Sequence, residues 1–224
     1  TDEPAVDTTL PGPKAKALVA DDGEVISPSS PRAYPLAVER AQGLTVTDVD
    51  GNEFWDFASG IAVTNVGHRH PSVVQAAKDQ LDQLVHPAFC DYYSPEPTRL
   101  AERLVDIAPG GSSKKVFFGN SGAEAVEAGM KLARHHTGRH RCLAFEGGFH
   151  GRTMGALSLT ASKSKYKRGF GPLVSGVEHV PFPNLARHSD EDVAMDATFD
   201  AIENLIRTRV PVDEIAGIVV EPVK

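Results

Sequence analysis

The residues whose types and spacing suit chemistry begin at a glycine-rich turn, residues 119–122. Ser121, followed three residues later by Glu124, forms a capping box, which predicts that a helix begins at Ser121. The first backbone N–H groups of a helix have no intrahelical acceptor and lie at the positive end of the helix dipole, where a phosphate binds well. An ordinary capped helix has the same pattern, so both interpretations are open at this point.

A second group of such residues follows the apolar run at residues 142–145. Phe149, His150 and Arg152 stand among glycines just after this predicted strand, at the edge where open α/β sheets bind ligands. Phe149 suits stacking on a planar ring, and the Arg152 guanidinium suits bidentate binding of a carboxylate. A core position for Phe149 and a solvated surface position for Arg152 are the alternatives.

Strands and helices alternate around these groups. Short apolar runs predict strands at residues 116–118, 142–145, 177–180 and 215–220. The last run is continuous, as expected of a buried parallel strand, and it delivers Glu221 to the carboxyl end of the sheet. This alternation is typical of an α/β fold with a mainly parallel sheet.

Amphipathic spacing predicts the helices. One begins at Ser121, and another covers residues 196–209 with inward-facing apolar side chains. These inward side chains are Phe199, Ile202 and Ile206. A third begins at residues 94–95 and ends at the Pro-Gly-Gly of residues 109–111.

The amino-terminal part predicts a β-hairpin and a helix. Residues 44–57 alternate polar and apolar side chains around the turn at residues 50–51, and Trp55 and Phe57 are expected to face a core. The helix follows residues 67–71, with His70 or Ser72 as its cap. Its buried stripe is expected to comprise Val74, Ala77, Leu81 and Leu84.

Three stretches carry a family resemblance: GNSGAEAVEAGMKLAR, FEGGFHGRT and, upstream, DGNEFWDFASGIAVTNVGHRHPSVVQAA. They resemble the class III (omega) aminotransferases, pyridoxal-phosphate enzymes of fold type I, in particular the 4-aminobutyrate and ornithine branch. The resemblance spans residues 35–224. It implies transamination from an omega-amino acid to a 2-oxo acid such as 2-oxoglutarate. A racemase or epimerase on the same scaffold and a non-catalytic fragment are the alternatives.

The resemblance assigns the cofactor contacts of pyridoxal 5'-phosphate. Ser121, Gly122 and Ala123 correspond to much of the phosphate cup. Many family members carry a hydroxyl residue at the position of Ala123, which here offers only its backbone N–H. Phe149 corresponds to the residue that stacks on the ring, and His150 lies beside it.

The resemblance also assigns substrate contacts. Arg152 corresponds to the arginine that binds the substrate carboxylate, Glu221 to a gate residue and Ile61 to a pocket position. From its apolar character alone, Ile61 is expected to be buried. The family's Schiff-base lysine and pyridinium aspartate are expected beyond Lys224. No catalytic residue is therefore assigned within the chain, and these 224 residues alone are expected to be inactive.

The domain organisation follows from composition and from the resemblance. Residues 1–34 are rich in Pro, Asp and Ser without periodicity and are interpreted as an amino-terminal arm. Residues 35–75 correspond to the amino-terminal part of a small domain. Residues 76–224 correspond to the pyridoxal-phosphate-binding large domain, which is incomplete at its carboxyl terminus.

Composition narrows the class of protein. A formal net charge of -7 argues against a nucleic-acid binder, and no apolar run approaches the length of a membrane span. Two cysteines indicate a reducing compartment, and a cytoplasmic location is expected. His68 and His70 lack further ligands at metal spacing, so no metal site is predicted. The family implies a homodimer.

Overall fold

The computed structural model describes residues 3–29, 31–111, 113–186, 188 and 190–222. The chain forms two compact units, residues 1–96 and 97–224. No helix within the described ranges is both long enough and apolar enough to span a membrane.

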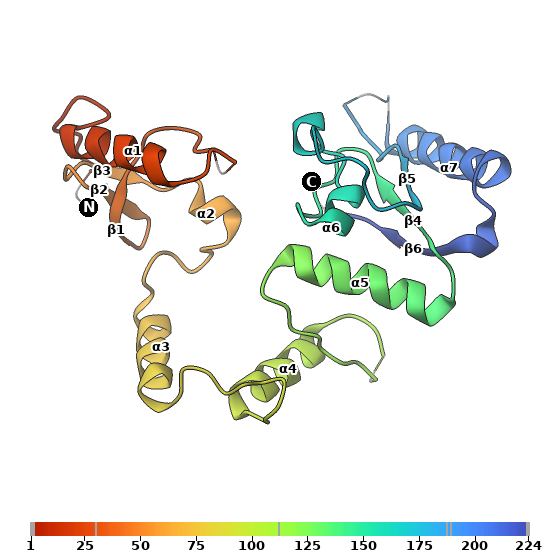
Figure 1. The fold of residues 1–224 in the computed structure, drawn as a ribbon, viewed down its shortest axis with the longest axis horizontal. Coiled ribbons are helices and arrows are strands. Elements are labelled where there is room, and N and C mark those ends of the chain that lie inside the picture. Colours follow the sequence, from red (N-terminus) through yellow and green to blue (C-terminus); the bar gives the residue numbers. More distant parts are fainter. Residues whose placement is uncertain (1–2, 30, 112, 187, 189, 223–224) are drawn as a thin grey trace. The chain divides into compact units, whose positions relative to one another are not determined.

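The first unit contains a small antiparallel sheet (Figure 1). Its elements are α1 (Pro13–Val25), β1 (Val38–Gln42), β2 (Thr45–Asp48), β3 (Glu53–Trp55), α2 (Ser59–Ala62) and α3 (Pro71–Gln83). Strands β2 and β3 pair antiparallel, with Val46 opposite Phe54. The predicted hairpin around residues 50–51 is therefore confirmed.

The amino-terminal segment contains a helix, α1, that sequence analysis missed. Its N-cap position is Gly12, which has no side chain to cap the helix. The Asp50 carboxylate of the hairpin turn takes over this role and accepts hydrogen bonds from the N–H groups of Lys14 at 2.9 Å and Ala15 at 2.8 Å. The helix thus depends on a residue about 35 positions away.

Several side chains of the first unit expected to be buried are exposed. The exposed fractions are 54% for Trp55, 89% for Phe57 and 92% for Ile61. Trp55 ends β3 and Phe57 lies beyond it, so these two rings pack edge-on against each other rather than under the sheet. Ile61 lies in α2, a left-handed turn in which its φ is 64°.

The predicted buried stripe of α3 is also wrong. No residue of this helix is buried, and Leu84 lies just past its end. His70 occupies the N-cap position, but without a side-chain hydrogen bond. Amphipathic spacing identified the helix correctly, but it carries no information about which element covers the apolar face.

The second unit is built around a parallel sheet (Figure 1). Its elements are α4 (Pro95–Ile107), α5 (Gly122–Thr137), β4 (Arg141–Phe145), α6 (Met154–Leu159), η1 (Ser164–Tyr166), β5 (Val177–Val180), α7 (Glu191–Thr208), η2 (Val212–Glu214) and β6 (Ile215–Val219). The strand order is β5-β4-β6, and both pairs are parallel. This confirms the α/β class and the mainly parallel sheet.

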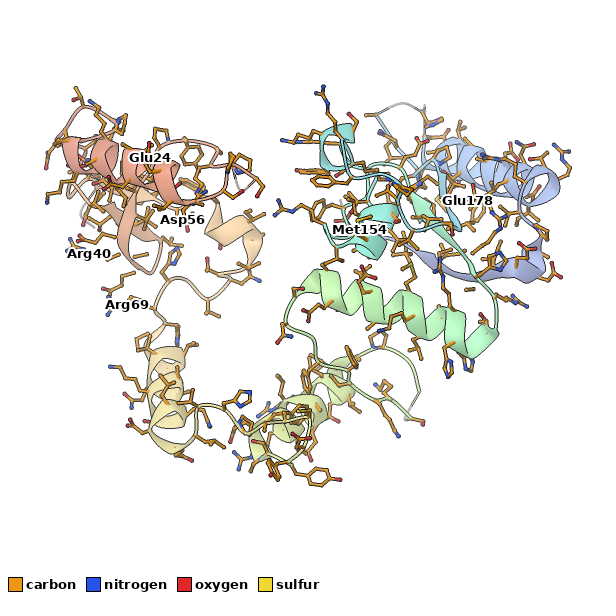
Figure 2. All side chains as sticks on the ribbon, in the orientation of Figure 1. Glu24, Arg40, Asp56, Arg69, Met154 and Glu178 are labelled. Atoms are coloured by element: carbon orange, nitrogen blue, oxygen red, sulfur yellow. The ribbon has the colours of Figure 1, made fainter. Side chains whose placement is uncertain are left out.

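Alternate residues of β4 face two different helical layers. Cys142 and Ala144 pack with Met130 of α5 and Leu159 of α6. Leu143 faces the other side and packs with Leu205 of α7. Figure 2 shows the side chains of both layers, with Met154 at the start of α6 and Glu178 on β5. The central strand is therefore buried on both faces, as expected of a parallel sheet.

Three expectations for the second unit are wrong in detail. Residues 116–118 form no strand, and Phe117 is 72% exposed, because no strand among the described residues pairs with this run. Strand β6 lies at the edge of the sheet, so Ile218 is 56% exposed rather than buried. Helix α7 begins at Glu191, and it turns Leu205 inward while Phe199 stays exposed.

Arg141 joins the amino ends of the three strands. Its Nη1 binds Glu178 of β5 at 2.9 Å, and its Nε binds Glu214, just before β6, at 3.0 Å. These contacts and the parallel pairing fix the register in which the strands deliver their carboxyl ends.

Replacing Asp50 by alanine tests the remote cap. The variant leaves the first N–H groups of α1 without their carboxylate acceptor, which costs about 1 kcal/mol in typical helix caps. We expect faster hydrogen exchange of the α1 amides, by about fivefold, with the exchange of β4 unchanged. Glu39→Ala removes an exposed carboxylate of β1 and is the control. Equal α1 exchange in both variants would contradict the assignment.

Candidate active site

The carboxyl edge of the parallel sheet adjoins an open pocket of about 650 Å³. Residues from the start of α5 and from the loop after β4 form its wall. They are Gly122, Ala123, Val126, Phe149, His150, Gly151, Arg152 and Thr153. Most of the residues predicted from sequence to bind cofactor or substrate therefore line a single pocket.

The start of α5 has the predicted cap. Ser121 is the N-cap, and its Oγ accepts a hydrogen bond from the N–H of Glu124 at 3.2 Å. The Glu124 carboxylate returns to the N–H of Asn120 at 2.6 Å, one residue earlier than in a standard capping box. Ser121 does not line the pocket, because its hydroxyl serves the helix. The N–H groups of Gly122 and Ala123, which precede the first intrahelical bond, lie at the pocket wall.

The loop after β4 approaches this helix start very closely at Gly151. The residue has a φ of 129°, and a Cβ placed on it would lie 2.7 Å from the Cβ of Ala123. Only glycine permits this backbone conformation and this contact together. A side chain at residue 151 would therefore push the loop away from the start of α5.

Phe149 and Glu221 connect two strand ends. The N–H of Phe149 donates to Glu221 Oε2 at 3.0 Å, which ties the loop after β4 to the residue after β6. The Phe149 ring is 43% exposed, lines the pocket, and packs edge-on against Tyr166 with centroids 5.4 Å apart. The prediction that β6 brings Glu221 to the carboxyl edge of the sheet is confirmed.

Thr160 organises the next residues of the loop and was missed by sequence analysis. Its buried Oγ1 accepts a hydrogen bond from the N–H of His150 at 2.9 Å and lies 2.9 Å from the carbonyl oxygen of Gly151. His150 is itself largely buried. Nothing in the local sequence marks Thr160, since its role depends on a contact ten residues away.

Glu127, also missed, supports the far end of the pocket wall. Its Oε1 accepts hydrogen bonds from Thr153 Oγ1 at 2.7 Å, from the N–H of Gly155 at 2.8 Å and from the N–H of Ala156 at 3.1 Å. Burial alone would raise the pKa of this carboxyl, but these donors and the nearby charge of Lys131 together hold it below the ordinary value. One sequence signal was available, because Glu127 stands one helical turn after Ala123.

The remaining predicted substrate residues differ in their surroundings. Arg152 is exposed at the pocket wall, and no carboxylate among the described residues forms an ion pair with it. Its guanidinium is thus available to an anionic ligand. Ile61 lies in the first unit and is not among the residues that line the pocket.

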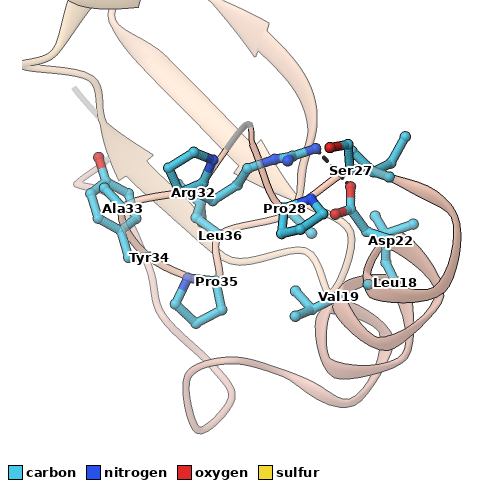
Figure 3. Close-up of a pocket in the computed structure, with 14 residues that line it drawn as sticks. Leu18, Val19, Asp22, Ser27, Pro28, Arg32, Ala33, Tyr34, Pro35 and Leu36 are labelled. Atoms are coloured by element: carbon cyan, nitrogen blue, oxygen red, sulfur yellow. Dashed lines mark hydrogen bonds and ion pairs between the residues drawn. The ribbon is translucent and has the colours of Figure 1, made fainter. Parts of the chain in front are cut away.

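A second pocket, of about 630 Å³, lies in the first unit between α1 and residues 31–37 (Figure 3). Leu18 and Val19 contribute apolar surface, and the Arg32–Asp22 ion pair, at 2.8 Å, closes part of its wall. No residue of the predicted cofactor or substrate sites lines it. The pocket beside the sheet is therefore the candidate active site.

This pocket suits a ligand that carries both a phosphate and a planar ring. The start of α5 offers backbone N–H donors and a positive dipole end, while Phe149 offers an aromatic side chain. Arg152 adds a positive charge to the lining of the pocket.

Comparisons with known proteins agree with this geometry. The family model described as aminotransferase class-III matches residues 26–224. A probable 4-aminobutyrate aminotransferase of Bacillus subtilis is 43% identical over 193 residues, which cover 84% of this chain and 44% of the relative. An alanine/serine racemase of Pyrococcus horikoshii is 35% identical, covering 99% of this chain and 48% of the relative. The chain thus spans about half the length of the curated relatives it matches.

A solved structure shares the fold. The amine transaminase from an uncultivated Pseudomonas species, in its pyridoxal-phosphate-bound form, superposes with a TM-score of 0.77 at 29% identity, covering 88% of this chain and 48% of that one. The fold is therefore that of the fold type I transaminases. The match of the family model over most of the chain shows that it belongs to the class-III aminotransferases, whose cofactor is pyridoxal 5'-phosphate.

Proposed function

We propose that the protein transfers the amino group of an omega-amino acid, such as 4-aminobutyrate or an ornithine-like donor, to a 2-oxo acid such as 2-oxoglutarate. One observation carries the proposal: the start of α5, Phe149 and Arg152 meet in one pocket at the carboxyl edge of the sheet. The 4-aminobutyrate aminotransferase relative supports this donor class.

The chain's own residues bind and orient the cofactor. The N–H groups of Gly122 and Ala123 hold the phosphate, with Ser121 fixing the helix start that presents them. Phe149 packs on the ring, and His150 lies beside it. When bound, pyridoxal phosphate supplies the electron sink that labilises bonds to the substrate's amine-bearing carbon.

The other residues select the substrate. Arg152 binds a carboxylate remote from the reacting amine, which favours omega-amino donors. Glu221 uses Oε2 to hold Phe149, and we assign its second oxygen to pair with an arginine, as a gate that switches between the two substrates of the reaction. The family resemblance assigns Ile61 a substrate-binding role as an apolar residue.

The organisation of the whole protein is part of the proposal. We propose residues 35–75 as part of a small domain and residues 76–224 as part of the cofactor-binding domain of a homodimer. The family resemblance supports these two domain ranges and the homodimer. The use of only two cysteines, one of them exposed, supports a cytoplasmic location.

A racemase is the second candidate, because an alanine/serine racemase aligns with nearly the whole chain. Such an enzyme inverts its amino acid without a 2-oxo acid acceptor. Incubation of the full-length protein with a chiral amino acid in the absence of any 2-oxo acid separates the two functions. Loss of optical purity under these conditions would favour the racemase.

Replacing Gly122 by aspartate tests the phosphate cup. A Cβ at residue 122 meets no atom within 4 Å, and an acidic residue in the first helical turn is favourable, so folding is preserved. The new carboxylate repels the phosphate. We expect at least about a tenfold loss of affinity for pyridoxal phosphate, but not for pyridoxal, measured by equilibrium dialysis on the full-length protein.

The matched control is Ala125→Asp, which adds the same charge in the same helical turn at an exposed residue outside the pocket. It should leave both affinities within about twofold of the native values. Equal losses in the two variants, or equal losses for the two ligands, would show that the helix start does not hold the phosphate.

Replacing Arg152 by alanine tests the carboxylate site. Removal of a bidentate charged contact should raise the KM for a 4-aminobutyrate-like donor by about 10- to 100-fold, with little change for an amine that has no carboxylate. Steady-state kinetics of the full-length protein with both donors measures this difference. Arg168→Ala, at another exposed arginine of the same unit, is the control. An unchanged KM for the carboxylate donor would refute the role.

A further inference from the structure

The segment that follows Arg152 begins helix α6 without a side-chain cap of its own. Thr153 is the N-cap residue of α6, but its side chain makes no capping hydrogen bond to that helix. The donors that a local cap would satisfy are instead bound from a different helix. Glu127 of α5 accepts the N–H groups of Gly155 and Ala156, and the Thr153 hydroxyl as well.

All three of these hydrogen bonds end on the same oxygen, Glu127 Oε1. The carboxylate therefore fixes a side chain and two consecutive backbone groups relative to α5, the helix whose start forms the other wall of the pocket. Arg152 is joined directly to Thr153, so its backbone position follows from this anchor.

Gly155 makes the anchor dependent on close packing. A Cβ added at this residue would collide with the Glu127 carboxylate and with the terminal methyl of Met130. A side chain at residue 155 would have to displace the Glu127 carboxylate, because the carboxylate occupies the space of a Cβ. The contact therefore has a steric requirement in addition to its hydrogen bonds.

We propose that Glu127 is a positioning residue that locks the pocket wall formed by residues 151–153, and with it the Arg152 guanidinium. The expected effect on substrate binding rests on the proposed function. Glu127 itself is not among the residues that line the pocket. Its effect passes through the backbone of the wall, which it holds at a fixed distance from the phosphate-binding helix start.

Three variants of the full-length protein separate acceptor geometry from charge. Glu127→Ala removes the acceptor and should raise the KM for a carboxylate-bearing donor about tenfold, with a smaller effect on kcat. Glu127→Gln keeps an oxygen in the place of Oε1 and should restore the KM to within about threefold of the native value. Glu203→Gln, at an exposed residue of α7, is the matched control and should change nothing.

Hydrogen exchange of residues 153–157 provides a readout that is independent of activity. In the ligand-free protein, Glu127→Ala should increase exchange at Gly155 and Ala156 by at least about tenfold, while Glu127→Gln should not. If the protein proves not to be an aminotransferase, these exchange measurements still test whether Glu127 holds residues 153–156. Unchanged exchange in the alanine variant, or a glutamine variant as impaired as the alanine variant in both assays, would overturn the proposal.

A double-mutant cycle with Gly155→Ala tests the steric part. The added methyl displaces the Glu127 carboxylate, so the single variant should show the same fast exchange at Ala156 as Glu127→Ala. In the Glu127→Ala background, Gly155→Ala should increase hydrogen exchange at Ala156 by less than about half of the increase that it causes in the native background. Fully additive effects would show that the two residues act separately.

The pH dependence of this anchor has a defined sign. Because the pKa of Glu127 is held below its ordinary value of 4.5, the stability gained from its ionised form is present above that value and is lost as pH falls through the lowered pKa. The melting temperature of the native protein should therefore be higher than that of Glu127→Gln at a pH of about 7. The difference between the two melting temperatures should become smaller below a pH of about 4. A difference that widens on acidification would contradict the ionised anchor.

Discussion

The close contact between Gly151 and Ala123 is the constraint on which the rest of the pocket depends. It brings the loop after β4 against the first turn of α5, so that backbone N–H groups and a guanidinium share one small space. A side chain at residue 151 would separate the two walls. Glu221, Thr160 and Glu127 then accept hydrogen bonds from backbone N–H groups of this segment and hold it in the conformation that the contact allows.

Sequence patterns predicted the parts of the fold that depend on local interactions. The cap at Ser121 and the hairpin around residues 50–51 involve neighbours in the chain, and both are confirmed. The strands at residues 142–145 and 177–180 are also confirmed; they pair with remote residues, but the apolar run that marks each one is a local signal. Residues of the site that follow a strand end or open a helix could also be identified, because topology sends such positions to the same edge of a parallel sheet.

Burial was predicted less well, because it depends on which element covers an apolar face. Trp55, Phe57, Ile61 and Phe117 have the composition of core residues, yet each is largely exposed in the described chain. The apolar pattern identifies which face of a helix or strand is hydrophobic, but the surface that buries this face belongs to another part of the protein. Supporting residues such as Thr160 escaped detection for a related reason, since their hydrogen bonds join positions that no short motif connects.

The pocket walls and most of their supports come from one uninterrupted piece of chain, residues 121–160, to which Glu221 and Tyr166 add supports from elsewhere. Such a piece can be inherited as a unit. An aminotransferase and a racemase among the relatives of this chain are each compatible with it, since in the proposed function the segment binds the phosphate and ring and leaves the fate of the substrate to other residues. Divergence of reaction type within this family would then be concentrated outside these forty residues.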